Sequence, residues 1–587
     1  MIVGVILLLS LLVDSAIYLN HLPWAGRYLG HDWSIGLPVW LNGFYWVREN
    51  GLWEVPWATP AKCGAYPFFA TEGFYSLGSV LSWVMPPVLA AQVTFVVFTG
   101  LGALGFYLVL RKSLGLSVVP ALLGAALFMF NGFSGHRMII GHFGFHGFLL
   151  MPWIALIAIE CSKASRLSRW QGAALIGLMI TYMVHCPMLQ ILPPTLLCVA
   201  AILVFDMLLN GFRKGMPWVV LFWGVLFSMA LSLSKLVAFQ SLMAQFPRTY
   251  YPLPGVEGFG RLIQLTLEVL FSQVPDGIDS RITNSAFLIQ RHEWEYGLSP
   301  LPVLLMVLVL LADGEKIWAQ CSSALKVPLK AAALGVLGFL MLLPLLLNWY
   351  QPQWNAFLKT LPFLGSSSNL IRWMILYIPM VLILAALSLD RLLECFRISQ
   401  SRAFGVLALS LIGLFLWTLR SDFSYYNQSY LSAPVEDAWH RGKAGEIPKV
   451  HAIADVVRGN GPNDGIVMGV SAIQCYEPTM GYGLEKFPVG ALHSGPVFPE
   501  DKASVNLKNP ACYLYPEENQ CHPGDHFTLE QREEAEKLVA YKPFRFEFSK
   551  RQLWANRVTT LSLLLALIIL VLPWVLKWFM TARARDH

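Results

Sequence analysis

The chain has 587 residues, of which 56% are hydrophobic and 13% are charged, and its formal net charge is +6. A soluble domain carries about a quarter charged residues, so this composition excludes a soluble enzyme, a disordered protein and a disulfide-rich secreted module. The 21 Trp residues are typical of a chain with many membrane–water interfaces. A polytopic membrane protein remains, and the small positive charge gives no argument for a nucleic-acid partner.

Apolar runs of about 20 residues, the length that crosses a bilayer, occur about twelve times. We expect membrane spans at 1–20, 88–110, 117–134, 139–161, 171–187, 188–208, 216–238, 298–312, 329–348, 371–390, 403–420 and 556–577. The first run lacks the basic start and the small-residue cleavage site of a signal peptide, so we interpret it as an uncleaved span. The expected fold is an all-α polytopic membrane protein.

The loops between these spans alternate in charge. About 16 Lys and Arg residues lie in the loops after spans 2, 4, 6, 8 and 10 and in the C-terminal tail, which places both termini in the cytoplasm. The long loop after span 1 carries only Arg27, Arg48 and Lys62. Every long hydrophilic segment then faces out, namely 21–87, 239–297, 349–370 and 421–555, so we expect the functional site at the external face.

Three parts follow from this topology. They are a transmembrane helical domain over 1–420 whose external loops 21–87 and 239–297 are expected to hold the functional site, an external soluble domain over 421–555, and a last span with its tail over 556–587. A predicted helix at His451–Val457 and a predicted strand at Gly465–Val470 indicate a small α/β fold for the soluble domain. Cys512 and Cys521 lie in a turn-rich stretch, where they form either a disulfide or two free thiols.

The first external loop is rich in aromatic residues and contains a candidate carboxylate. Gly36–Asn50 is a predicted helix that is too short to cross, so we expect it to lie in the plane of the membrane interface, and Phe74–Val84 has a similar pattern. His31 and Asp32 come just before the first of these helices. Asp32 therefore lies either at the external mouth of the bundle as a functional acid or at the helix start as a cap.

Ionisable side chains close to the membrane are costly to bury and are therefore functional candidates. His142 and His146, four residues apart, are expected to share a helix face beside His136 and Arg137. Such a face can bind a phosphate or a metal ion, and the alternative is a hydrogen-bonded packing pair. Lys235 lies near the outer end of span 7 and is a further candidate.

Two later loops add acids and a cation. Asp276 and Asp279 flank a Gly turn whose oxygen atoms suit Mg²⁺ or Mn²⁺, with a solvated turn as the alternative. Glu293 lies at the start of span 8, where a helix N-terminus favours negative charge in any case. Ser366–Asn369 and Arg372 begin span 10 and form either an anion cradle or an ordinary cap with an interfacial Arg.

A first span followed by a long external loop with an early acid and interfacial helices resembles the GT-C superfamily of polytopic glycosyltransferases. Within that superfamily the chain is similar to the YfhO-like bacterial membrane proteins. The similar segments are FMFNGFSGHRMIIGHFGFHGFLLMPWIALIAIE (128–160), EWEYGLSPLPVLLMVLVLLA (293–312) and LPFLGSSSNLIRWMILYIPMVLILAALSLDRLLE (361–394). With the first loop, they cover about half of the chain.

The resemblance implies an inner-membrane enzyme with a polyprenyl-phosphate-sugar donor, a glycan, lipid or protein acceptor on the external face, and Asp32 as the catalytic base. The residues expected near the donor phosphate are His136, Arg137, His142, Lys235 and Arg372, and those expected near the acceptor or a metal are His31, Asp276, Asp279 and Glu293. Asp32 stands alone in HDWS, where a paired acid would be usual, which leaves metal dependence open. A transporter or flippase of a lipid-linked envelope precursor is the alternative function.

Overall fold

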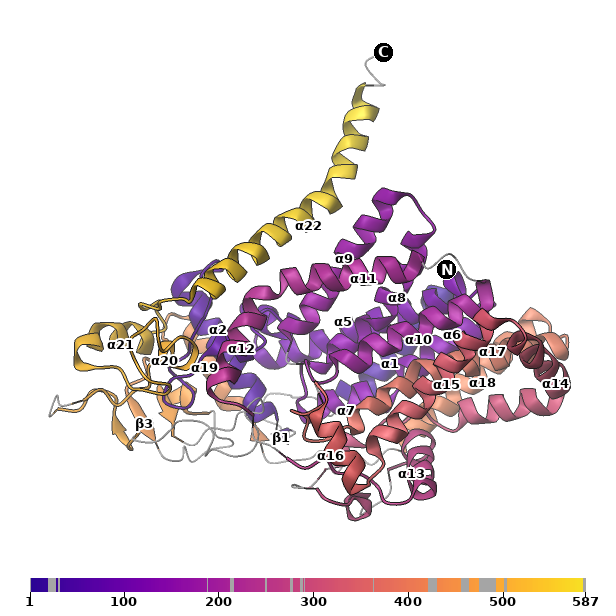
Figure 1. The fold of residues 1–587 in the computed structure, drawn as a ribbon, viewed down its shortest axis with the longest axis horizontal. Coiled ribbons are helices and arrows are strands. Elements are labelled where there is room, and N and C mark those ends of the chain that lie inside the picture. The colour runs from indigo at the N-terminus through magenta and orange to yellow at the C-terminus, as the bar shows by residue number, and fades with distance from the viewer. Residues whose placement is uncertain are drawn as a thin grey trace.

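The structure is a computed structural model that describes residues 2–19, 28–29, 32–186, 188–211, 216–248, 251–274, 278–285, 289, 291–362, 364–420, 430–454, 464–473, 492–500 and 504–583. Helices make up most of the described chain, and its strands are two or three residues long. Figure 1 shows a bundle of long helices with a smaller mixed segment at one end. This mostly helical architecture agrees with the expected class.

Nine helical stretches in the described part of the chain are long and apolar enough to cross a membrane. They are α1 (Ile2–Leu19), α5 with a π-helical turn (Pro87–Ser113), α6 (Val118–Met129) with α7 (Gly132–Ile140), η2 (Phe145–Leu150) with α8 (Met151–Ser162), α10 (Leu192–Asn210), α15 (Pro328–Asn348), η5 (Ile371–Leu376) with α17 (Tyr377–Cys395), α18 (Gln400–Leu419) and α22 (Lys550–Arg583). Helices α11 (Met216–Leu231) and α12 (Leu233–Gln245) meet at 64° and make a tenth if they form one bent span.

The other two expected spans are helices of a more polar kind. Helix α9 (Arg166–His185) begins with two Arg residues in its first turn, and α14 (Leu301–Leu325) carries Asp313, Glu315 and Lys316. Because of these polar residues, neither helix is apolar enough over a membrane-length stretch. The count of twelve spans therefore stays a prediction.

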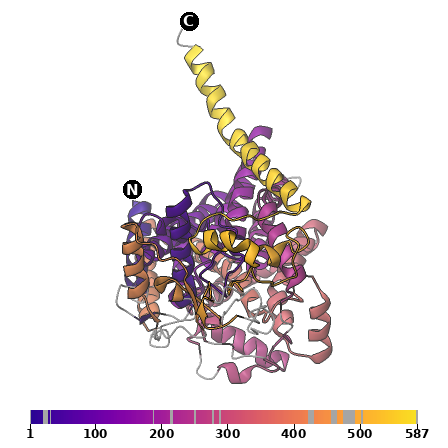
Figure 2. The same ribbon diagram turned by 90° about the vertical axis from the view of Figure 1, so that its left-hand side faces the viewer.

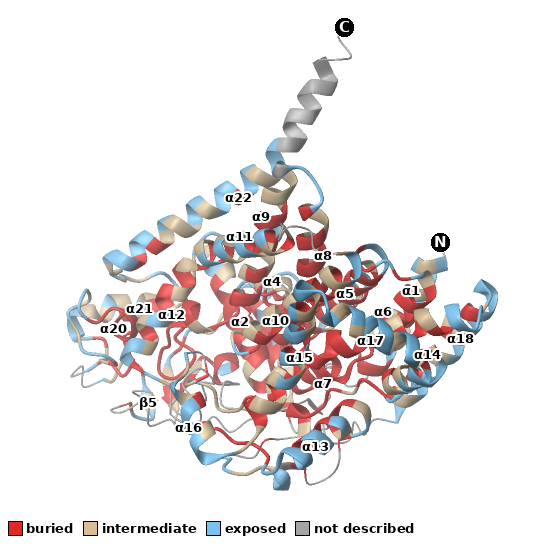
Figure 3. Cartoon of the chain, turned by 45° about the vertical axis from the view of Figure 1, so that its right-hand side comes forward, coloured by how far each residue is buried: buried red, intermediate tan, exposed pale blue. Residues whose placement is uncertain are grey.

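The bundle is most buried at its centre. In Figure 3, α6, α7 and α8 are mostly red, whereas α14, α18 and α22 are largely pale blue. Of the span formed by α6 and α7, 89% is buried in protein, against 11% of the α22 span. The exposed side chains of α18 and α22 are mainly Leu, Ile and Val, as expected of surfaces that meet lipid tails.

Helix α22 is attached to the bundle through its first half. Figures 1 and 2 both show its C-terminal half standing clear of the other helices. Polar side chains hold the first half at the break between α11 and α12: Ser234 Oγ donates to Asn556 Oδ1 (2.7 Å) and Ser234 N donates to Thr559 Oγ1 (3.0 Å). Gln552 Nε2 donates to the Ser234 carbonyl at 3.0 Å. Thr559 Oγ1 also donates to the Ala230 carbonyl at 3.2 Å, so Thr559 pairs both the N–H and the carbonyl that the break removes from the helix ladder.

The helix expected in the first loop is α2 (Trp33–Asn50), and it is buried in protein. Helix α19 (Ala433–Lys443) packs against it, so that Phe44 stacks on Trp439 with ring centroids 5.4 Å apart. From further along the chain, Tyr541 meets Tyr45, also at 5.4 Å. Protein therefore covers the apolar side chains that were expected to lie in the membrane interface. The second expected helix, Phe74–Val84, is the shorter α4 (Leu77–Ser82), and another short helix, α3 (Phe68–Thr71), precedes it.

The segment after α18 contains a small mixed sheet with strand order β4 (Val470–Ala472), β3 (Ala452–Ala454) and β5 (Gly495–Pro496). Strand β3 pairs in parallel with β4 and antiparallel with β5. The helix expected at His451–Val457 is wrong over 452–454, because Ile453 is buried between two neighbouring strands. The strand expected at Gly465–Val470 is a 3₁₀ turn (Asp464–Met468) that leads into β4.

Several contacts link the segment after α18 to the first loop, and a disulfide lies within the segment. Strand β1 (Tyr28–Leu29) pairs antiparallel with β2 (Tyr430–Leu431). Helices α20 (Ala511–Leu514) and α21 (Arg532–Val539) complete the segment, and a disulfide with an S–S distance of 2.07 Å joins Cys512 to Cys521. Residues of the first loop, including α2, and residues of the segment after α18 pack in one hydrophobic core.

Candidate functional site

Asp32 begins α2 and lies against the end of α7. Its backbone N–H donates to the Ile140 carbonyl at 3.1 Å. The side chain makes no capping bond to α2; instead, Oδ2 lies 2.7 Å from Nε2 of His142. The alternative that Asp32 serves as a side-chain cap is therefore excluded, and 20% of the side chain remains exposed.

Gly141 allows the Asp32 and His142 segments to meet. It ends α7 with a φ of 105°, in the left-handed region that favours Gly. A Cβ at this position would lie 2.5 Å from Trp33 N and 2.6 Å from Asp32 C. Trp33 adds a bond from its Nε1 to the Ile139 carbonyl at 3.1 Å. The approach of α2 to α7 thus depends on the absence of a side chain at position 141.

The imidazole of His142 connects Asp32 to Arg137. Nη1 of Arg137 lies 3.2 Å from Nδ1 of His142. Since a guanidinium can only donate, Nδ1 accepts, and the neutral ring carries its proton on Nε2 and donates it to Asp32. Burial lowers the pKa of His142 and the bond to Asp32 raises it, with a net downward shift to which Arg137 and Arg372 contribute. His142 is therefore neutral at pH 7.

Glu293 holds two guanidinium groups in place. It lies in the 3₁₀ turn η4 (Arg291–Glu293) before α14, with 7% of its side chain exposed. Nη2 of Arg137 lies 2.9 Å from Oε2, while Arg372 donates through Nε to Oε2 (3.0 Å) and through Nη2 to Oε1. Burial raises the pKa of Glu293, but Arg137 and Arg372 outweigh it and hold the pKa well below its usual range.

Aromatic rings and one amide complete the surroundings. The guanidinium carbons of Arg372 and Arg137 lie 5.3 and 5.7 Å from the ring centroid of Phe145, within cation–π range. Nη1 of Arg372 donates to Oε1 of Gln190. The ring of His292 meets the edge of the His142 ring at 5.0 Å. One buried cluster thus combines two carboxylates, two guanidiniums and two imidazoles.

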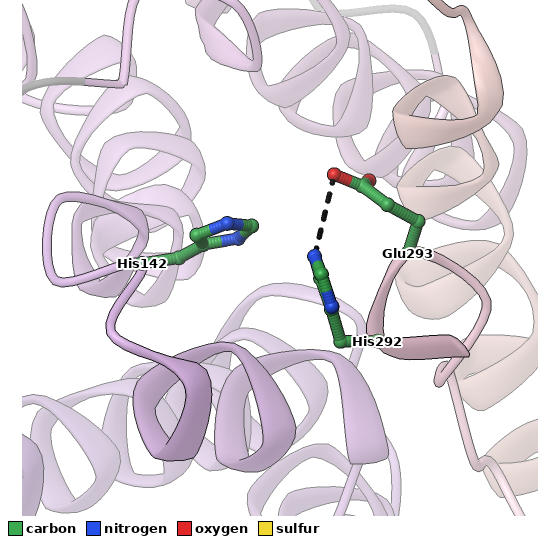
Figure 4. A group of neighbouring side chains, drawn as sticks. All are labelled: His142, His292 and Glu293. Atoms are coloured by element: carbon green, nitrogen blue, oxygen red, sulfur yellow. Dashed lines mark ion pairs between the residues drawn. The ribbon is translucent and has the colours of Figure 1, made fainter. Parts of the chain in front are cut away.

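Three of these side chains have the spacing of a metal site. One ligand atom from each of His142, His292 and Glu293 lies within 4.8 Å of the others, and Figure 4 shows the three groups facing one another. Imidazole and carboxylate ligands suit Zn²⁺ or Mn²⁺. However, Arg137 and Arg372 already bind the carboxylate, and Arg137 binds His142. These two positive charges oppose a divalent cation, so the surroundings fit one poorly.

Acid should destabilise the protein through this cluster. Burial lowers the pKa of both His142 and His292, whereas His side chains in the unfolded chain titrate at about 6.5. The unfolded chain therefore binds protons first, so stability is complete above about pH 6.5 and declines as the pH falls below it. We expect the melting temperature in detergent to drop on acidification, and to drop less in the double variant His142→Asn/His292→Asn. The exposed His522→Asn variant should behave as wild type, and an equal drop in all three proteins would refute this origin.

Two of the residues expected near a donor phosphate have other partners. Lys235 is buried in α12 and donates to the carbonyls of Phe69 (3.2 Å) and Glu72 (2.5 Å), which fastens the first loop to α12. Nδ1 of His136 lies 2.9 Å from the Gly132 carbonyl. Neither side chain contacts the Asp32 cluster through an interaction that the structure describes. The cluster therefore keeps Arg137, His142 and Arg372 of the expected set and adds Glu293.

The remaining expected residues divide into two groups. His31, Asp276 and the side chain of Asp279 lie outside the described residues. His146 does not share a face with His142, because residues 145–150 form a 3₁₀ helix, and its Nε2 pairs with the Tyr182 hydroxyl at 2.6 Å. His146 is therefore a buried, hydrogen-bonded side chain that packs apart from His142.

The residues expected from the sequence do not include His292 or Gln190. His292 could have been found, because it is ionisable and precedes Glu293 beside an expected span, which is the reasoning that selects Glu293. Gln190 has no such signal, because a neutral amide in a turn is common. Its role follows from its contact with Arg372.

Comparison with known proteins leaves the cluster as the basis for a functional argument. No protein-family model matches the chain, and no curated protein matches it. The resemblance to the GT-C superfamily is thus an interpretation of the residue pattern alone, and the function is argued below from the geometry.

Proposed function

We propose that the protein is a glycosyltransferase that moves a sugar from a polyprenyl-phosphate donor to a hydroxyl group of an envelope glycan, lipid or protein. One observation carries the proposal: the partly exposed carboxylate of Asp32 is joined through His142 to Arg137, beside Arg372, at the ends of membrane helices. A base for a hydroxyl proton and cations for a lipid phosphate thus share one site.

In the proposed reaction, the acceptor oxygen attacks the anomeric carbon as its proton passes to the Asp32 carboxylate. The bond from that carbon to the phosphate oxygen breaks, and its electron pair leaves with the polyprenyl phosphate, so the anomeric configuration inverts. His142 donates to Asp32 Oδ2 and orients the carboxylate. Because His142 is neutral, it leaves the negative charge of Asp32 in place to accept the proton.

The guanidinium groups are proposed to stabilise the departing phosphate. Arg372 has 17% of its side chain exposed and donates Nη1 to the neutral amide of Gln190, which a phosphate oxygen can replace. Arg137 is almost fully buried, and it acts on the phosphate site indirectly, through its contacts with His142 and Glu293. Glu293 holds both groups at fixed positions, so they need little reorganisation as charge develops on the leaving group.

We propose that this transfer needs no metal ion, because Arg137 and Arg372 supply the positive charge that a metal would otherwise provide. Exhaustive EDTA treatment should leave transfer unchanged, and Mg²⁺, Mn²⁺ or Zn²⁺ should not raise the melting temperature. A metal that raises the melting temperature of wild type but not of His292→Asn would overturn this part of the proposal.

The site is proposed to face the external side of an inner membrane, with both termini cytoplasmic. Cys512 and Cys521 form a disulfide, and Cys63 is also disulfide-bonded. Disulfides persist in oxidising compartments, so these bonds support an external location for the first loop and for the segment after α18. Cys161, Cys321 and Cys395, near the expected basic loops, are free.

The test of the proposed function is a transfer assay with the purified full chain. Polyprenyl-phosphate donors carrying different sugars are offered with a lipid and glycan extract of a bacterial envelope, and released polyprenyl phosphate is measured. Release that depends on both the acceptor extract and the protein supports the proposal. No release with any donor, from protein that melts cooperatively, would count against it.

A transporter or flippase of a lipid-linked envelope precursor is the second candidate. Asp14 is fully buried in α1, and neither of its carboxylate oxygens has a hydrogen-bond partner among the described residues. Ionisable residues at such depth mark proton and ion pathways in transporters. The Asp14→Asn variant separates the candidates, because a transferase keeps its turnover whereas a proton-coupled transporter loses its dependence on the proton gradient. We expect the turnover to be kept.

A further inference from the structure

Helices α14 and α17 pack side by side and are joined by an ion pair at each end. Just before the two helices begin, Arg372 binds Glu293 of the Asp32 cluster. Further along both helices, Nη2 of Arg391 on α17 lies 2.6 Å from Oδ2 of Asp313 on α14. The helices rise about 20 Å between the two pairs. The second pair therefore lies towards the end of the bundle that is opposite to the Asp32 cluster.

Helix α14 kinks at Asp313 and then leaves the bundle. Asp313 has φ −147° and ψ 21°, which are not helical values, and only 4% of its side chain is exposed. Arg391 also donates to Oε2 of Glu394 at 3.2 Å, which holds the kink beside the last turn of α17. Residues 314–325 are exposed or half-buried throughout, and α14 is largely pale blue in Figure 3. This part of the helix therefore packs only loosely on the rest of the protein.

Large apolar side chains are exposed on this part of α14 and beside it. Trp318 and Leu325, seven residues apart, share one face of the helix and are 75% and 59% exposed. Phe396, in the turn that joins α17 to α18, is 65% exposed. Before the kink, Leu311 is 80% exposed on the part of α14 that is expected to cross the membrane. The apolar surface of that part thus continues past the kink to a Trp, a residue typical of the membrane–water interface.

Basic side chains accompany this apolar surface. Residues 313–330 and 391–402 together contain six Lys and Arg residues and three acidic residues. Two of the three acids already pair with Arg391. Lys326, at the C-cap of α14, and Arg397, in the turn between α17 and α18, are both exposed. An anionic membrane surface fits this combination, because apolar groups enter the headgroup layer while cations are attracted to its negative charge.

We propose that residues 314–325 and the turn after α17 dock on anionic phospholipids at the membrane surface opposite to the Asp32 cluster. Their exposed apolar side chains enter the boundary between headgroups and acyl chains, and Lys326 and Arg397 bind the anionic headgroups. A second copy of the chain is a poorer occupant, because a symmetric contact would bring two basic faces together. The docking does not depend on the proposed transferase activity.

The test is photocrosslinking of the full chain in nanodiscs that contain equal amounts of phosphatidylglycerol and phosphatidylcholine with the same acyl chains. Trp318→benzoylphenylalanine places the probe on the proposed face, and mass spectrometry of the labelled peptide identifies its adducts. We expect lipid adducts in which phosphatidylglycerol predominates. The control is Leu529→benzoylphenylalanine, because Leu529 is exposed just before α21, which lies at the other end of the molecule from α14 in Figure 1. The control should give no lipid adduct.

Removal of two cations separates attraction by charge from simple contact with lipid. In the chain that carries the probe at position 318, Lys326→Gln/Arg397→Gln should lower the ratio of phosphatidylglycerol to phosphatidylcholine adducts about fivefold for each charge removed. Lys449→Gln/Lys542→Gln makes a similar change at exposed positions of the segment after α18 and should keep the original ratio. The absence of lipid adducts at position 318, equal amounts of the two lipids there, adducts to a second copy in place of lipid, or the same loss in both double variants would each overturn the proposal.

Discussion

Asp32→Asn should reduce the turnover number for sugar transfer by about 10²–10⁴, the usual contribution of a general base. The amide has the size of the carboxylate but cannot accept the acceptor proton, and its oxygen can still take the hydrogen bond from His142. The donor phosphate is expected to bind at Arg372, so the KM for the donor should change little. Initial rates of polyprenyl-phosphate release over a range of donor concentrations measure both quantities.

The matched control for this variant is Asp437→Asn, which makes the same change at an exposed position on α19. It should keep the wild-type turnover and KM. Turnover near wild type in Asp32→Asn would remove Asp32 as the base. A rise in donor KM without a fall in turnover would instead make Asp32 a binding residue.

Glu293→Gln should lower the free energy of unfolding by about 3–5 kcal/mol, as expected when a buried ion pair loses one partner. Both guanidiniums that share this carboxylate would lose their negative partner, and Arg137 has 1% of its side chain exposed, so water cannot replace it. Because the pKa of Glu293 lies well below its usual range, the effect should persist at mildly acidic pH. Chemical denaturation in detergent measures the loss.

Glu268→Gln is the matched control, because Glu268 pairs with Arg281 at the surface, where 27% and 41% of the two side chains are exposed. An exposed pair contributes about 0–1 kcal/mol, so this variant should be nearly as stable as wild type. Equal losses in the two variants would show that Glu293 does not hold a buried charge cluster. Adding Arg372→Gln to Glu293→Gln should cost less than the two single losses combined, because the residues interact directly.

Much of the helical layout could be predicted from the sequence. Apolar runs of membrane length have few alternatives in a chain with so little charge. In the described part of the chain, ten of the twelve expected runs are helices both long and apolar enough to span when α11 and α12 form one span. The break at Ser232 could not be predicted, because Thr559 of α22, more than 300 residues later, pairs the backbone groups that the break frees. Likewise, the partner of α2 lies nearly 400 residues away at Trp439.

Part of the candidate site could also be predicted from the sequence. Asp32, Arg137, Glu293 and Arg372 are recognisable because charge is rare beside membrane spans. Their assembly depends on packing: Gly141 brings Asp32 to His142 through a backbone contact that spacing does not indicate. Lys235 shows why closeness to a span is a limited guide, because it is buried but donates to backbone carbonyls.

We propose that a polyprenyl-phosphate sugar binds with its phosphate at Arg372, beside Asp32. Native mass spectrometry of the full chain with such a lipid tests this binding without knowledge of the acceptor. Wild type and Asp32→Asn should retain the lipid, and Arg372→Gln should lose it. Retention of the lipid by Arg372→Gln at the wild-type level would show that the phosphate does not bind at Arg372.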